Sequence, residues 1–146
     1  MSAADTRRGL QFATTASLVA ATGLMIAPTY PMIWGVTGED GAPATHTTLH
    51  SWFSPLLPGY GGFFPFLGAI AIAVAAAISI YQLIVKRPRV QVAIWSGVGV
   101  GLVLIGVFIF GLGTLLAWVP VVLALAGAIC GWLAAQPALP DRVDAP

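Results

Sequence analysis

The chain has 146 residues, of which 58% are hydrophobic and only 8% are charged, whereas about a quarter of an average soluble domain is charged. Its net charge of +1 gives no basic field that would attract nucleic acid. A chain this apolar cannot cover itself with polar surface in water, so the composition predicts an integral membrane protein. The single cysteine, Cys130, excludes both an intrachain disulfide and a Cys-x-x-Cys redox pair.

The first predicted transmembrane helix covers residues 10–34, inside the uncharged stretch from Gly9 to Gly38. Pro28 and Pro31 predict a kink near its end, because each proline removes a helical hydrogen bond. The preceding Arg7 and Arg8 also fit a twin-arginine export signal. The apolar run is longer than the core of a typical leader, which has about 7–15 residues, so we expect this helix to be retained.

Three more spans follow. The uncharged stretch from Gly41 to Val85 begins with many Pro, Gly, Thr and His residues. It therefore predicts a long outer loop over 35–62 and a helix over 63–85. From Val90 to Pro140 there is again no charge, and the chain can break at Gly111–Thr114 or at Pro120. The first break gives helices over 90–110 and 115–136, each about long enough to cross a bilayer. The predicted fold is an all-α membrane protein, a single domain over 1–146 with four transmembrane helices.

The basic residues predict the orientation of these helices. With four spans, all six Lys and Arg fall on one side: Arg7, Arg8, Lys86, Arg87, Arg89 and Arg142. By the positive-inside rule that side is cytoplasmic, so both termini are inside and the long first loop is extracytoplasmic. Five Arg against one Lys, with no Asn, suggest GC-rich codons. We therefore expect a multi-pass protein of a bacterial plasma membrane.

Small residues spaced four apart predict where the helices pack, because such residues let helix backbones approach closely in lipid. Each predicted helix carries such a pattern, which indicates a compact bundle or a bundle with an additional docking seam. In the second, third and fourth helices the candidate packing residues are Ala69, Ala73, Ala77, Gly97, Gly101, Gly127 and Gly131.

The outer loop contains the candidate partner-binding surface. Thr45 can cap a short helix in which Leu49, Trp52, Phe53 and Leu56 form an apolar stripe at helical spacing. Such a helix would lie in the headgroup plane or against a partner. Together with the aromatic residues that follow, the predicted interface is Trp52, Phe53, Leu56, Tyr60, Phe63 and Phe64.

His46 and His50 are the candidate metal ligands. Their spacing of four would put both on one face of a helix, as in a two-histidine metal pair. A catalytic zinc usually has a third protein ligand, and the nearest carboxylates, Glu39 and Asp40, lie across the flexible Gly41–Ala44 segment. We therefore assign no metal site. The alternatives are interfacial histidines that bond headgroups or backbone, and a pH-sensitive contact.

No predicted span contains Asp, Glu, Lys, Arg or His, although such residues usually mark ion paths and proton relays. The sequence also has no nucleotide loop or nucleophile motif. We assign no catalytic residue and no cofactor, and expect a non-catalytic accessory subunit of a multisubunit membrane complex. A respiratory assembly of the cytochrome oxidase or supercomplex type is the first candidate, by analogy of size and composition. Its partners would be other integral membrane subunits and lipid, with no nucleic acid and no soluble substrate. The alternatives are a small homo-oligomeric channel or carrier, and a metalloenzyme that uses His46 and His50.

Overall fold

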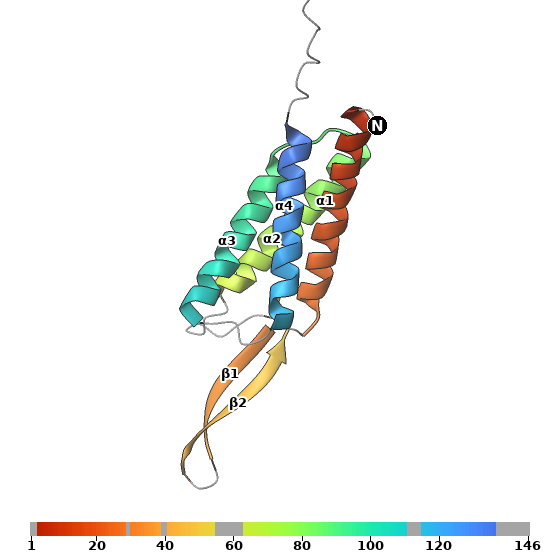
Figure 1. Ribbon diagram of the computed structural model, residues 1–146. Helices are drawn as coiled ribbons and strands as arrows, with labels where there is room; N and C mark the ends of the chain where they lie inside the picture. The colour runs from red at the N-terminus through yellow and green to blue at the C-terminus, as the bar shows by residue number, and fades with distance from the viewer. Residues whose placement is uncertain (1–2, 29, 39–40, 55–62, 111–114, 137–146) are drawn as a thin grey trace, which may run out of the picture.

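The computed structural model describes residues 3–28, 30–38, 41–54, 63–110 and 115–136. It is a bundle of four helices with a β-hairpin at one end, as Figure 1 shows. All four helices are long and apolar enough to cross a membrane. The elements are, in chain order, α1 (Ala3–Ile26), β1 (Tyr30–Thr37), β2 (Pro43–His50), α2 (Phe63–Val85), α3 (Gln91–Phe110), η1 (Leu115–Ala117) and α4 (Trp118–Ala135).

Helix α1 differs most from its predicted range of 10–34. It begins at Ala3, so that Arg7 and Arg8 are helical, and it ends at Ile26. The helix stops before Pro28, because the residue preceding a proline disfavours the helical conformation and proline offers no N–H. The expected kink is therefore a helix end, and residues 30–34 belong to a strand instead.

The other three helices lie close to their predicted ranges. Helix α2 occupies the predicted 63–85, and α3 begins one residue later than predicted. The predicted break at Gly111–Thr114 lies outside the described residues. After it, η1 leads into α4, where Pro120 is buried in the first turn. Its missing N–H costs little there, because the first four N–H groups of a helix have no partner within the helix.

The helices form an antiparallel bundle in which each packs against its neighbours in sequence, and α1 closes the ring against α4 (Figure 1). Their buried residues recur at alternating spacings of three and four. On α3 this series is Val92, Ser96, Gly99, Val103 and Gly106, and Val100 is buried beside it. Such spacing is typical of helices that cross at a shallow angle with interlocking side chains.

Glycines bring α2 and α3 into backbone contact. A Cβ built on Gly68 would lie 2.7 Å from the carbonyl oxygen of Gly99, and one on Gly99 would lie 2.8 Å from the oxygen of Gly68. Between α1 and α4, a Cβ on Gly127 would lie 2.8 Å from Leu18 Cγ. These approaches are what small residues allow in membrane helices, where packing rather than water exclusion holds helices together.

The predicted packing residues divide into two groups. Ala69, Gly127 and Gly131 are buried in the bundle, whereas Ala73 is half-buried and Ala77 is exposed. Gly97 and Gly101 have nothing within 4 Å of a built Cβ, so they are not the contact of α3 with the bundle. The reason is angular, since consecutive helical residues are about 100° apart. Of the three glycines in this run, only the middle one, Gly99, faces the core.

Candidate functional site

The hairpin β1–β2 projects beyond the bundle (Figure 1). Its strands of eight residues pair antiparallel, with Tyr30 opposite His50 and Thr37 opposite Pro43. At the turn, Gly41 has a φ of +76°, which favours glycine, and the Gly38 N–H donates to the Ala42 carbonyl at 2.8 Å. Antiparallel pairs alternate between hydrogen-bonded and non-hydrogen-bonded. Counting from the bonded pair at 38 and 42 therefore shows which backbone groups point away from the hairpin.

This count places both prolines at non-hydrogen-bonded pairs. Pro31 lies opposite Leu49 and Pro43 lies opposite Thr37, where a residue's N–H points outward and proline loses no pairing. The same alternation turns the backbone N–H and C=O groups of Thr45, Thr47 and Leu49 outward along β2. No described helix covers this edge, so β2 offers a row of unpaired groups to another strand.

The predicted amphipathic helix from Leu49 to Leu56 is wrong over its described part, because Leu49 and His50 end a strand and a turn follows. Trp52 lies in the core of the bundle. Its side chain is only 1% exposed and belongs to the same buried cluster as Met25 and Ala117. The helical spacing of Leu49 and Trp52 therefore does not mark one helix face, because Leu49 belongs to a strand and Trp52 belongs to the core.

Trp52 and Ser51 join the base of the hairpin to α1. The Trp52 N–H donates to the Met25 carbonyl at 3.0 Å, and the Ser51 hydroxyl donates to the same oxygen at 3.1 Å. Met25 lies in the last turn of α1, where carbonyls lack partners within the helix. The segment after β2 therefore caps α1 and fixes the hairpin to the end of the bundle.

The other predicted interface residues are scattered. Phe53 is half-buried against the core, Phe63 is 60% exposed, and Phe64 is half-buried with its ring in edge contact with Phe63. Leu56 and Tyr60 lie outside the described residues.

His46 and His50 lie on a strand, not on a helix. Side chains four apart share a strand face but are separated by about 13 Å, which is too far for one metal ion. His50 Nε2 lies 2.8 Å from the Thr48 hydroxyl. Among the residues that the structure describes, no group of three His, Cys, Asp or Glu could hold a metal. The proposed helical arrangement of these two histidines is therefore wrong.

Inside the bundle the buried polar side chains mostly bond to backbone. The hydroxyls of Thr14, Ser79 and Ser96 donate to carbonyls of their own helices. Gln82 Oε1 accepts the N–H of Arg89 at 2.9 Å. The Nε2 groups of Gln11 and Gln82 are buried without a hydrogen-bond partner among the described residues. No sequence pattern singles out these two glutamines.

The end of α2 has an unusual cap. The Arg87 N–H donates to the Gln82 carbonyl, and Lys86 between them has a φ of +57°. This is the position that usually holds glycine when a helix ends in a left-handed residue. A lysine there costs on the order of 1 kcal/mol in backbone strain.

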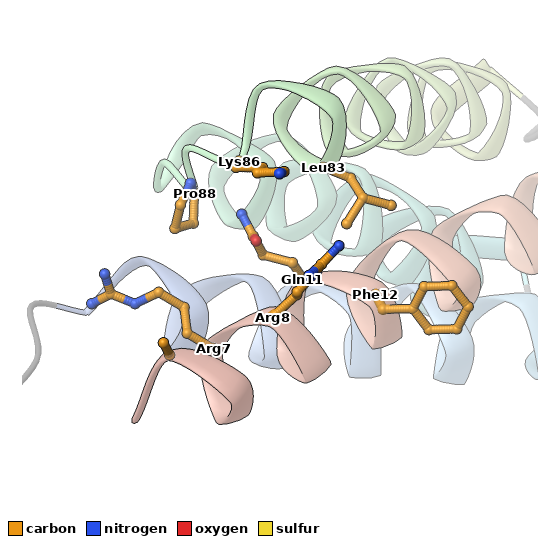
Figure 2. Close-up of a pocket in the computed structure, with 8 residues that line it drawn as sticks. Arg7, Arg8, Gln11, Phe12, Leu83, Lys86 and Pro88 are labelled. Carbon is orange, nitrogen blue, oxygen red and sulfur yellow. The ribbon is translucent and has the colours of Figure 1, made fainter. Parts of the chain in front are cut away.

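Beside this cap is a cavity of about 630 Å³ between α1 and α2, at the end of the bundle opposite the hairpin. Figure 2 shows Arg8 and Gln11 reaching from α1 toward Leu83 and Lys86 of α2, while Arg7 extends toward the end of α4. The Arg7 guanidinium donates to the Gln136 carbonyl there. The cavity joins three cations, one amide and apolar walls, a combination that neither helix shows by itself in the sequence.

Comparisons with protein-family models, with curated proteins and with solved structures find no match to this chain.

Proposed function

We propose that this chain is a non-catalytic accessory subunit of a multisubunit complex in the bacterial plasma membrane, and that the outward edge of β2 binds a neighbouring subunit. The observation that carries the proposal is the hairpin, which projects from the bundle and whose β2 edge is paired with no element in the described part of the chain. A respiratory assembly of the cytochrome oxidase or supercomplex type is the class of complex that we would test first.

The physical argument is that an isolated two-stranded hairpin is at best marginally stable in water. This one is tied to α1 at its base through Met25, but its strands reach on the order of 25 Å beyond that point. A strand from a partner, added beside β2, would pair the outward groups of Thr45, Thr47 and Leu49. Leu49 is 58% exposed, and the partner would also cover its apolar side chain.

The distribution of charge supports the same role and an orientation with both termini in the cytoplasm. Every described Lys, Arg, Asp or Glu lies near the end of the bundle opposite the hairpin. The buried hydroxyls of the spans are bonded to carbonyls of their own helices. We therefore propose that chemistry is carried out by neighbouring subunits, and that this chain contributes contacts.

The test is affinity purification of the tagged chain in mild detergent, followed by mass spectrometry of the proteins that copurify. We expect other integral membrane subunits in stoichiometric amounts. Thr47→Pro removes one outward N–H without breaking a pair inside the hairpin, so it should reduce partner recovery. Thr47→Val keeps the N–H and the strand preference, and is the matched control.

Equal recovery with Thr47→Pro and Thr47→Val would refute pairing at the β2 edge. If no other protein copurifies at all, the accessory role itself fails.

A homo-oligomeric channel or carrier is the second candidate, favoured by Gly97 and Gly101. Both face away from the bundle with nothing within 4 Å of a built Cβ, so a second copy could approach α3 closely there. Solute flux into liposomes that contain only the purified chain would support this candidate over the first.

A further inference from the structure

We infer that the cavity between α1 and α2 binds the phosphate group of an anionic phospholipid. This inference is independent of the accessory role, because it concerns the opposite end of the molecule from the hairpin. Four features surround one cavity of about 630 Å³: a cluster of cations, a side-chain amide without a partner among the described residues, a lysine with a strained backbone, and an apolar wall.

The charges around the cavity favour an anionic ligand. Arg7, Arg8 and Lys86 line the cavity, and among the residues that the structure describes no acidic side chain lines it. The one carboxylate among the described residues, that of Asp5, lies in the first turn of α1 and outside the lining. The Arg7 guanidinium already donates a hydrogen bond to the Gln136 carbonyl at the end of α4. Arg8 and Lys86 are therefore the main cations available to bind a phosphate. Basic pockets between helices on the cytoplasmic side are typical sites for anionic headgroups.

The backbone of Lys86 is strained where this residue lines the cavity. Glycine would adopt the φ of +57° without strain, yet the chain places a lysine there and Pro88 lines the same cavity two residues later. Strained residues concentrate where the strained position serves a function. Here the left-handed turn places a cation on the cavity at the end of α2.

Gln11 adds a polar side chain to the cavity. This side chain lines the cavity, and its Nε2 is buried without a hydrogen-bond partner among the residues described. A buried donor without an acceptor is costly. Because Nε2 has almost no accessible surface in this conformation, a phosphate or ester oxygen would supply the missing acceptor once the Gln11 side chain turns toward the cavity.

The apolar part of the lining favours a lipid over a soluble phosphate compound as the ligand. Phe12 lies one helical turn deeper than Arg8, about 6 Å along α1, and Leu83 lies below Lys86 in the same sense on α2. Both line the cavity, and Phe12 is 66% exposed. The cations therefore lie at the level of headgroups and the apolar side chains at the level of acyl chains. A soluble phosphate would leave these apolar walls uncovered, whereas a phospholipid covers both parts.

The experiment places a photo-reactive phenylalanine analogue, benzoylphenylalanine, at position 12 of the full chain. The protein is reconstituted in vesicles of equimolar phosphatidylglycerol and phosphatidylcholine, and mass spectrometry measures the adducts with each lipid. We expect a preference for the anionic lipid. Arg8→Ala and Lys86→Gly should each lower that preference about tenfold, because a cation that donates a hydrogen bond directly to the phosphate contributes more than a cation that only lies near the membrane surface.

Two features keep the test sharp. Lys86→Gly relieves the left-handed strain, so it should leave the fold at least as stable while it weakens lipid binding. Arg89→Ala removes the same charge from the same end but outside this cavity, so it should change the preference by less than about twofold if binding is local.

Three results would overturn the inference. Equal adducts with both lipids would mean that the cations serve only to orient the chain. An equal loss with Arg89→Ala would mean a diffuse surface attraction. Loss of the lipid adduct on addition of glycerol phosphate or inorganic phosphate, at concentrations similar to the lipid's, would assign the cavity to a soluble phosphate compound.

Discussion

The close contact between α2 and α3 makes a sharp prediction about two glycines of one helix. Gly99→Ala should destabilise the bundle, and Gly97→Ala should not. The chemical change is the same at both sites, and both lie inside α3. Only the surroundings differ, since a Cβ at Gly99 meets Gly68 and Ile72, whereas a Cβ at Gly97 meets nothing within 4 Å.

The size of the effect follows from the distances. The new Cβ would lie 2.8 Å from the Gly68 oxygen and 3.1 Å from the Ile72 nitrogen, while ordinary contacts require roughly 3.5 Å. These atoms are backbone, so the helices must separate by about 0.7 Å. Such overpacking costs about 1–3 kcal/mol. The helix-propensity gain of alanine over glycine, up to about 1 kcal/mol, is shared by both variants, so we expect a difference of about 2 kcal/mol between them.

The measurement is unfolding by sodium dodecyl sulfate in mixed micelles, followed by far-ultraviolet circular dichroism. The free energies of unfolding of the two variants are compared at one detergent composition. Gly68→Ala and Gly101→Ala form a second pair with the same expectation, because Gly68 is in contact and Gly101 is not. If both members of each pair agree within about 0.5 kcal/mol, the proposed backbone contact does not carry the packing.

Two further predictions concern the outer end and the orientation. Trp52→Ala should lower the free energy of unfolding by about 3 kcal/mol, because an aromatic ring is lost from the core. Trp132→Ala should lower it far less, because the Trp132 ring on α4 is 53% exposed. Similar losses for the two variants in the same detergent titration would contradict the core position of Trp52. In a Cys130→Ser background, Thr47→Cys should react with a membrane-impermeant maleimide in intact cells, and Arg87→Cys should react only after permeabilisation. The reverse pattern would invert the orientation.

The four helices were readily predicted because charge-free stretches and bilayer thickness leave few choices. The hairpin was missed because residues 30–34 extended an apolar run that was counted as helix. The signal was present, since Tyr30, Ile33, Trp34, Thr45 and Thr47 are strand-forming types on either side of the Gly38–Ala42 turn. The apolar residues that begin at Leu49 suggested a helix in place of this strand. Their helical spacing arose by chance, because the strand ends at His50 and the buried Trp52 follows.

The packing face of α3 could also have been found. A spacing of four selected Gly97 and Gly101, but the repeat of threes and fours through Val92, Ser96 and Gly99 identifies the buried face. The cationic cavity is different, because its lining comes from two helices whose distance no sequence pattern gives. The left-handed conformation of Lys86 could not be predicted either, because the sequence signal for such a helix end is usually a glycine, and this position holds a lysine.

The backbone contact of α2 with α3 also decides what one copy of this protein can let through. Where Gly68 and Gly99 touch, no flexible side chain can swing aside to open a bore, and Leu18, Ile72 and Val103 fill the neighbouring interior without exposure. The described bundle is therefore closed to solutes at this depth. A path for a solute would have to run outside a single bundle, between this molecule and a neighbouring one.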